Sequence, residues 1–283
     1  MSGTVPTFRS ATASNSAFII LESLLMSLIL LAPRCTAIRV HFPHWRVLRA
    51  ATAKTVNVSI PIEELKPFAR SQSGEDIRVF QNYLCGLQNG TFLELGALDG
   101  ERFSNTYMFE YKLGWRGVLI EGNPRSFESL WKKRPNAVTI HSAVCSEYQI
   151  VHYTMKDQPA VDGILEFMTD SFKESWHKNW QSYTEDEAPP VPCYPFSSLI
   201  SLAGVRHVDV MFLDVEGGEL SVLQSVPFGD FKVDVMVIEA TGREREERVR
   251  AFMADVGYKH MESWGRSEWF VRNDWQPSPC PQN

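Results

Sequence analysis

A glycine-containing turn flanked by two acids spans residues 94–100, Glu-Leu-Gly-Ala-Leu-Asp-Gly, and follows an apolar run. Gly96 and Gly100 let the chain turn sharply and let backbone approach a ligand closely. Glu94 and Asp99 would repel a pyrophosphate, which prefers glycines together with a helix N-terminus and a lysine. The turn therefore predicts a site for a cationic group, such as an amino group or a sulfonium. The alternative is an ordinary acidic turn, because acids and glycines are common in turns.

Another acid, Glu121, ends the next apolar run, which contains Val118, Leu119 and Ile120. An acid roughly 20 positions or more beyond a glycine turn is placed to accept hydrogen bonds from a ribose diol. A surface acid, or a cap for the helix that starts near Pro124, is the alternative. Taken together, the glycine turn and the spaced acid predict an adenosyl ligand.

Three more acids stand at the ends of two later apolar runs, namely Asp214, Glu216 and Glu239. Such carboxylates can orient a ligand, act as a general base or bind a divalent metal such as Mg²⁺ through oxygen ligands. Helix capping is the alternative, above all for Glu216, which precedes a helix. His177 and His260 are candidate bases by residue type alone, and a lone histidine is more often structural.

The elements that must position these residues alternate between strand and helix. Near-continuously apolar strands that alternate with helices predict a mostly parallel sheet with helices on both faces. In such a sheet, ligands bind at the carboxyl ends of the strands. We expect strands at 91–95, 117–121, 138–142, 208–214 and 233–239, helices at 104–113, 125–134, 197–203, 218–225 and 244–255, and a final antiparallel hairpin at 258–262 and 268–272.

The composition is that of a globular protein. The 283 residues are 44% hydrophobic and 22% charged, which excludes a disordered, collagenous or multi-span membrane protein. The net charge of −6 supplies no basic field for nucleic acid, so no nucleic-acid partner is expected. The five cysteines are too sparse to predict a disulfide scaffold, and they form no C-x-x-C zinc motif.

The N-terminal part is a separate kind of sequence. Residues 18–32 are almost wholly apolar, and a small-residue stretch follows at 35–37, which suits a signal peptide or a membrane anchor. We expect residues 1–37 to direct the chain to the secretory pathway and residues 38–72 to form a stem. Basic residues after the apolar run favour the alternative of a cytosol-facing anchor, and the acid-free start permits an organelle transit peptide. Sequons at Asn57 and Asn89 weakly favour a lumenal domain.

Four strings occur in order in the remaining part of the chain: FLELGALDG at 92–100, SNT at 104–106, GWRGVLIEGNP at 114–124 and DVMFLDVEGGEL at 209–220. In these strings the chain resembles the FkbM family of S-adenosylmethionine-dependent O-methyltransferases, over about residues 73–272. The resemblance implies a class I methyltransferase fold, Rossmann-like, with a seven-stranded, mostly parallel sheet and a catalytic domain at 73–283. It also implies methyl transfer to a hydroxyl, often on a sugar or another small metabolite.

The resemblance also assigns roles to residues. It places Asp214 beside the transferred methyl and Glu121 on the ribose, while Leu98 replaces the middle glycine of the wider class I pattern. The remaining cofactor-binding residues that it implies are Glu94, Gly96, Ala97, Asp99 and Gly100 at the methionine end, Asn105 and Thr106 near the cofactor carboxylate, and Ser142 and Ala143 near adenine.

The insertion at 155–196 carries aromatic side chains and His177, and we expect it to form a lid over a glycan or small-molecule acceptor. Asp214 or a histidine would then deprotonate the acceptor hydroxyl, or Asp214, Glu216 and Glu239 would hold Mg²⁺ to lower its pKa. The rival hypothesis is a non-catalytic, membrane-tethered trafficking or interaction protein that retains the fold. The animal protein Star, which resembles the same family, is such a case.

Overall fold

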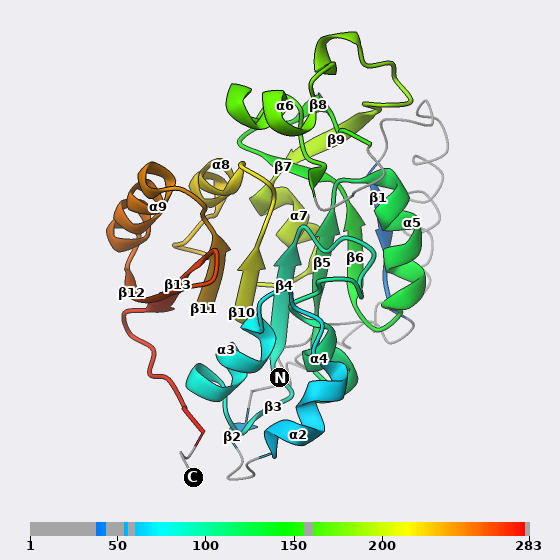
Figure 1. The fold of residues 1–283 in the computed structure, drawn as a ribbon. Helices are drawn as coiled ribbons and strands as arrows, with labels where there is room; N and C mark the ends of the chain where they lie inside the picture. Colours follow the sequence, from blue (N-terminus) through cyan, green and yellow to red (C-terminus); the bar gives the residue numbers. More distant parts are fainter. Residues whose placement is uncertain (1–37, 44–53, 56–59, 156–160, 281–283) are drawn as a thin grey trace, which may run out of the picture. The chain divides into compact units, whose positions relative to one another are not determined.

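The computed structural model describes residues 38–43, 54–55, 60–155 and 161–280 (Figure 1). Its central sheet has the strand order β1-β6-β5-β4-β10-β11-β13-β12. The strands are β1 (Arg39–His41), β4 (Thr91–Leu95), β5 (Arg116–Glu121), β6 (Val138–His141), β10 (His207–Leu213), β11 (Lys232–Glu239), β12 (Tyr258–Trp264) and β13 (Ser267–Arg272).

The strands β6, β5, β4, β10 and β11 run parallel to one another, while β13 is antiparallel to both β11 and β12. The expected sheet and its terminal hairpin are thus confirmed. The strand order switches between β4 and β10: successive strands are added on one side of β4 up to β6 and on its other side from β10 onward. Ligands of open α/β sheets bind at such a switch point, beyond the carboxyl ends of the strands.

Two apolar layers cover the sheet, because side chains alternate between its faces. On one face, Leu93 and Met211 pack with α7 (Phe196–Ala203), α8 (Glu219–Ser225) and α9 (Arg243–Asp255). On the other face, Phe92 and Phe212 pack with α3 (Glu75–Tyr83), α4 (Tyr107–Tyr111) and α5 (Pro124–Lys133). The helices on both faces are those that a parallel sheet requires.

The expected stem contributes to this fold in its described parts. Strand β1 pairs antiparallel with β6 at the edge of the central sheet. A second short pairing joins β2 (Lys54–Thr55) to β3 (Leu87–Gln88). Residues 62–68 form α2 (Ile62–Leu65) and the 3-10 helix η2 (Lys66–Phe68), with Leu65 fully buried. The stretch at 18–32 and the sequon at Asn57 lie outside the described residues, and among the described helices none is long and apolar enough to span a membrane.

The segment between β6 and α7 forms a small sheet with two short helices. The sheet has the order β7-β9-β8, from β7 (Ala143–Cys145), β8 (Gln149–His152) and β9 (Pro190–Pro195). Between β8 and β9 lie α6 (Asp170–Trp176) and the 3-10 helix η4 (Trp180–Ser182). Figure 1 shows this segment, in green, beyond the carboxyl ends of β4 and β10. This segment, called the lid segment below, begins with β7, before the expected insertion at 155–196. It occupies the place expected of a lid.

Four of the five cysteines form two disulfides, Cys85–Cys280 and Cys145–Cys193. The cysteines were judged too sparse for a disulfide scaffold, so the sequence analysis did not predict these two bonds. The paired cysteines are 195 and 48 residues apart in the sequence, so no local pattern indicates either pair. Only the fold brings the partners together. The first disulfide holds the C-terminal segment to the end of α3, and the second joins β7 to β9 in the lid.

Candidate active site

The turn after β4 is held tightly between two neighbouring strands. Gly96 has a φ of +81°, and its N–H donates to the backbone oxygen of Ile120 at 3.0 Å. A Cβ added to Gly96 would lie 1.7 Å from the backbone oxygen of Asp214. Only glycine fits here, because the left-handed φ and the missing side chain are both required. The turn therefore lies against the strand end that carries Asp214.

The carboxylate of Glu121 lies beside the same turn and is 1% exposed. It accepts hydrogen bonds from the backbone N–H of Leu98, at 2.7 Å, and of Asn123. Burial raises the pKa of Glu121 to about 8, against the effect of these two bonds. Glu121 is thus a buried acid fixed at the end of β5.

The carboxylate of Glu94 fixes the loop 104–106. It accepts hydrogen bonds from Ser104 Oγ at 2.9 Å, Asn105 N at 2.7 Å and Thr106 Oγ1 at 2.6 Å. Arg134, fully buried, donates to Ser104 Oγ and to Thr106 Oγ1. Glu94 therefore holds the loop through three hydrogen bonds, and the bond to the backbone N–H of Asn105 fixes the position of that residue. Burial raises the pKa of Glu94.

Asp99 is neutralised within the protein. Its carboxylate accepts from Lys133 Nζ at 2.7 Å and from the backbone N–H groups of Glu101 and Arg102. Partial burial opposes ionisation, but these hydrogen bonds outweigh it and lower the pKa of Asp99. Asp99 thus shapes the turn and has its charge matched by a lysine. Ala97 is buried, and Gly100, with a φ of +83°, packs against the Arg134 side chain.

A small, mostly apolar cavity of about 40 Å³ lies beside Gly96. Ser142 and Ala143, which follow β6, and Tyr153 and Phe167 of the lid segment are among the residues that line it. Apolar walls with a few polar groups are typical of small-molecule sites.

Three carboxylates meet at the ends of β10 and β11. One oxygen each of Asp214, Glu219 and Glu239 lies within 4.8 Å of the others. Burial, a hydrogen bond with Glu239 and the charge of Glu239 raise the pKa of Asp214 well above its usual range. Burial also raises the pKa of Glu239, although Arg266 lies 2.9 Å from its carboxylate. Glu239 therefore favours the protonated form of Asp214, and burial favours that of Glu239.

Glu216 lies next to this group but is not part of it. Its backbone takes a φ of +53°, unusual for a residue with a side chain, in the loop between β10 and α8. Burial, together with the charges of Asp214 and Glu219, raises the pKa of Glu216 to about 8. A Cβ at Gly163 in the lid would lie 3.4 Å from the Glu216 Cβ, so the lid contacts this loop.

The two histidine candidates lie apart from this edge. His177 is fully buried within the lid, and its Nε2 lies 3.0 Å from the backbone oxygen of Val161. His260 lies on β12, with its Nε2 2.7 Å from a carboxylate oxygen of Glu268. Neither histidine lines the described cavities that contain Asp214 or Glu219. Their contacts favour packing roles over proton transfer.

Three site residues escaped the sequence analysis. Glu219 joins Asp214 and Glu239, while its other oxygen accepts from the backbone N–H of Gly217. The only sequence signal for Glu219 was its place five residues after Asp214, at the expected start of a helix. Asp162 and Tyr153 come from the lid segment. The charge of Asp162 helps to raise the pKa of Glu121, and the charge of Glu121 helps to raise the pKa of Tyr153. Nothing in the sequence around Asp162 indicates this approach.

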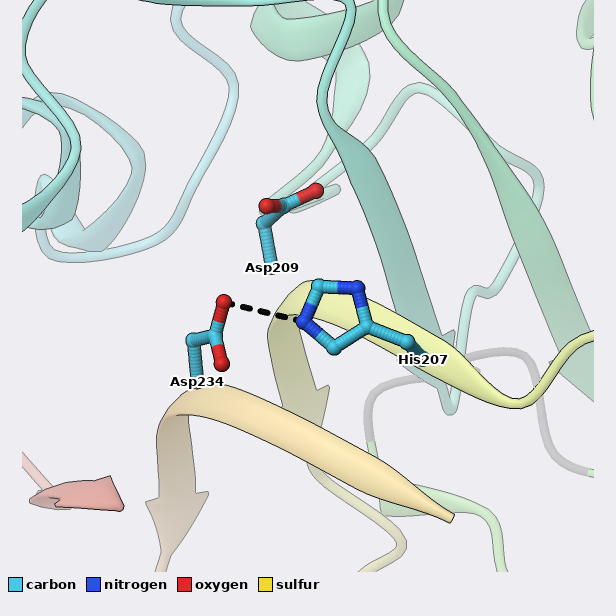
Figure 2. Close-up of side chains that lie close together, drawn as sticks. All are labelled: His207, Asp209 and Asp234. Carbon is cyan, nitrogen blue, oxygen red and sulfur yellow. Dashed lines mark hydrogen bonds and ion pairs between the residues drawn. The ribbon is translucent and has the colours of Figure 1, made fainter. Parts of the chain in front are cut away.

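A further cluster, His207, Asp209 and Asp234, lies at the opposite, amino ends of β10 and β11 (Figure 2). Asp234 accepts from His207 Nε2 and from an Arg272 nitrogen, both at 2.9 Å. Asp209 accepts from Thr91 N at 2.6 Å and from its hydroxyl at 2.9 Å. Because protein donors already engage both carboxylates, the cluster is an ion-pair network that ties four strand ends together.

The site fits a cofactor that brings a positively charged amino group. Asn105 Oδ1 and Asp214 Oδ1 are buried acceptor atoms without a hydrogen-bond donor in the described protein. Both residues line one cavity of about 30 Å³. Buried acceptors normally have donors, and bound ligands would supply them. The ammonium group of the cofactor would donate to Asn105 Oδ1, which leaves Asp214 Oδ1 for a second ligand. Glu121 and the apolar cavity would hold the ribose and adenine parts.

The strand order and this site define the class of an S-adenosylmethionine-dependent methyltransferase with a Rossmann-like fold. The family model described as the methyltransferase FkbM domain matches residues 94–260, more than half of the chain. The chain belongs to this family, so the resemblance seen in the sequence is confirmed.

Several solved structures resemble the chain. Fibrillarin from Aeropyrum pernix, solved with natively bound S-adenosyl-L-methionine, is 15% identical to this chain with a TM-score of 0.34. The match covers 65% of this chain and 66% of fibrillarin, so the chain spans slightly less than two thirds of fibrillarin's length. The precorrin-6y C5,15-methyltransferase from Geobacter metallireducens is 10% identical with a TM-score of 0.35, over 77% and 93%. The search of curated proteins finds no match.

We predict that the stability of the free protein falls as the pH rises from about 5 to 8, in part through Glu121. The pKa of Glu121 is about 8 in the fold against 4.5 ordinarily, so the folded state holds a proton that the unfolded state has lost. Stability decreases with pH wherever the folded state binds more protons. In Glu121→Gln this contribution is absent, so the stability advantage of the wild type should shrink as the pH rises.

Urea unfolding of both proteins at pH 5, 6, 7 and 8 measures this difference. The same variant should bind S-adenosylmethionine about 10- to 100-fold more weakly, as expected for loss of a charged acceptor. A constant stability difference across the pH range would show that Glu121 is ionised in the free fold. Unchanged cofactor affinity would remove Glu121 from the site.

Proposed function

We propose that the protein transfers a methyl group from S-adenosylmethionine to a hydroxyl oxygen of a sugar or another small metabolite. The observation that supports this is Asp214, at the carboxyl end of β10, whose buried Oδ1 atom has no hydrogen-bond partner in the described protein. Oxygen acceptors must lose a proton during methyl transfer, and a carboxylate with a raised pKa is a better base than an ordinary one. S-adenosylmethionine supplies an activated methyl, so the protein mainly aligns donor and acceptor.

The surrounding residues would tune Asp214. Glu239 favours its protonated form, and Arg266 stabilises the negative charge of Glu239. A cationic ligand next to Asp214 would favour its ionised form, since opposite charges lower a carboxyl pKa. The lid segment, which contacts the 214–218 loop through Gly163 and Phe167, would exclude water during transfer.

The same carboxylates fit a divalent cation. Asp214 Oδ1 and Glu219 Oε2 are buried oxygens without a hydrogen-bond partner in the described protein, and Glu239 completes the group. Hard cations such as Mg²⁺ prefer oxygen ligands of this type and lower the pKa of a bound hydroxyl. The metal set that we propose is therefore Asp214, Glu219 and Glu239, in place of the set with Glu216. Activity that survives exhaustive chelation would exclude a required metal.

The proposed reaction is tested by comparing methylated glycans and metabolites of cells that have or lack the protein, using mass spectrometry. Candidate acceptors are then incubated with purified protein and S-adenosylmethionine labelled in its methyl group. The proposal expects a labelled methoxy group on an acceptor oxygen. Label found only on nitrogen or sulfur would contradict O-methylation while leaving methyl transfer intact.

We propose that the domain matures in the secretory pathway, as the apolar N-terminal run suggests. The two disulfides support this, since disulfides form and persist in oxidising compartments and are rare in the cytosol. The Asn89 side chain is exposed, so the fold leaves this sequon accessible.

We therefore predict that the protein expressed in animal cells carries N-glycans. Endoglycosidase treatment should lower its apparent mass, and Asn57→Gln combined with Asn89→Gln should abolish this shift. Each single variant identifies which sequon is used. A chain with no shift in any form, and with a protease-accessible domain on intact microsomes, would indicate a cytosolic domain and cytosolic acceptors.

A further inference from the structure

A large cavity lies beside the carboxylate group, on the α9 side. Its volume is about 640 Å³, within the range of small-molecule sites. The first turns of α8 and α9, the loops before them and the lid segment form its walls. Glu219 belongs both to this wall and to the carboxylate group around Asp214. The cavity therefore lies next to the proposed reaction site, with Glu219 between them.

Three arginines at the start of α9 line the cavity, at positions 243, 245 and 248. The Arg245 guanidinium lies over the turn after Asp214, since a Cβ at Gly217 would be 3.5 Å from its Nη2. Its nearest carboxylate oxygen, on Glu219, is 3.8 Å away, at the outer limit of an ion pair. Arg245 thus retains donors that can face a ligand.

The other two arginines differ in their ion pairs. Arg243 binds Glu247 at 3.0 Å on the exposed surface. Arg248 has no ion pair with any residue in the described part of the chain, although Glu244 is one turn away. Three guanidinium groups and two carboxylates, Glu219 and Glu244, line the cavity, so positive charges outnumber negative ones among its lining residues.

The acids around Asp214 lie outside this cavity but next to it. Asp214 and Glu239 each place a carboxylate oxygen within 4.8 Å of one on Glu219, which lines the cavity. An acceptor in this space would have the arginines at one end and would direct its other end toward these acids. Such a charge gradient orients a molecule that has a neutral hydroxyl at one end and an anionic group at the other.

We propose that the acceptor is an anionic sugar, bearing a carboxylate, sulfate or phosphate group that Arg245 and Arg248 bind while its hydroxyl faces Asp214. This inference rests on the proposed function and specifies its substrate class. Arginine suits such groups because its planar fork donates two parallel hydrogen bonds to an oxyanion. The cavity volume is sufficient for a sugar of one or two rings.

The test uses the full protein saturated with S-adenosylhomocysteine, whose binding is measured first. Glucuronate, glucose 6-sulfate, glucose 6-phosphate and glucose are then titrated in separate calorimetric experiments. At least one anionic sugar should bind about 10- to 100-fold more tightly than glucose, the effect of a charge-assisted bidentate pair. The three anions distinguish carboxylate, sulfate and phosphate recognition.

The preference should disappear in the double variant Arg245→Gln, Arg248→Gln, which should keep its affinity for S-adenosylhomocysteine. Arg206→Gln, an exposed arginine before β10 at the other end of the strand, is the matched control and should retain the preference. Equal or undetectable binding of all four sugars overturns the anionic acceptor but leaves the methyltransferase proposal standing. Failure of the protein to bind S-adenosylhomocysteine overturns both.

Discussion

Asp214→Asn should lower turnover by about 10²- to 10⁴-fold, the contribution of a positioned general base, and change the affinity for S-adenosylmethionine much less. An amide keeps the shape of the carboxyl but cannot accept the hydroxyl proton or bind a metal well. The fold should persist, since the amide can donate to Glu239 as the protonated Asp214 carboxyl does. Steady-state kinetics with an identified acceptor, together with calorimetry of the cofactor, separate the two effects.

Asp209→Asn is the matched control for this variant. Asp209 is also buried on β10, but at the other end of the strand, where it accepts from Thr91. Its loss should reduce stability through a weakened buried network and leave turnover per folded molecule unchanged. Equal losses of cofactor affinity and turnover in Asp214→Asn would make Asp214 a binding residue with no part in proton transfer.

Gly96→Ala should abolish cofactor binding and strongly destabilise the domain, by about 3 kcal/mol or more when overpacking is added to backbone strain. The added Cβ would lie 1.7 Å from the backbone oxygen of Asp214, and backbone of a central strand end cannot move aside cheaply. The turn after β4 would have to separate from β10. Chemical denaturation and cofactor titration measure both effects.

Gly114→Ala separates strain from overpacking. Gly114 has a φ of +67°, also left-handed, yet an added Cβ would have nothing within 4 Å. This variant should lose only about 1 kcal/mol, the cost of a side chain in that backbone conformation, and should bind the cofactor normally. Similar losses in the two variants would show that the approach of Gly96 to Asp214 is not a tight contact in solution.

The sheet was predictable because its signal is local. Continuous apolar runs such as 208–214 and 233–239 mark buried parallel strands, and the observed strands begin and end within a residue or two of the expected positions. The acids at strand ends were also predictable, since the carboxyl ends of parallel strands share one edge. That reasoning predicts from the sequence alone that Glu121, Asp214 and Glu239 lie at one edge of the sheet.

The remaining features depend on contacts between distant segments. Asp99 and Glu94 were expected to face a cation of the ligand, but the fold supplies Lys133 to the first and the loop 104–106 to the second. Glu219 enters the carboxylate group because α8 starts close to β11, and sequence alone favoured Glu216 there. The disulfides and the edge strand β1 join segments roughly 50 to 200 residues apart, for which no periodic pattern exists.

The most direct test of the account is a calorimetric titration of S-adenosylmethionine into the purified, folded protein with its disulfides intact. The central claim is that the edge formed by Gly96, Glu121 and Asp214 is a working cofactor site. The account predicts saturable binding of one cofactor per chain, weakened by Glu121→Gln and unaffected by Gly114→Ala. A folded protein that shows no binding at any accessible cofactor concentration would contradict it.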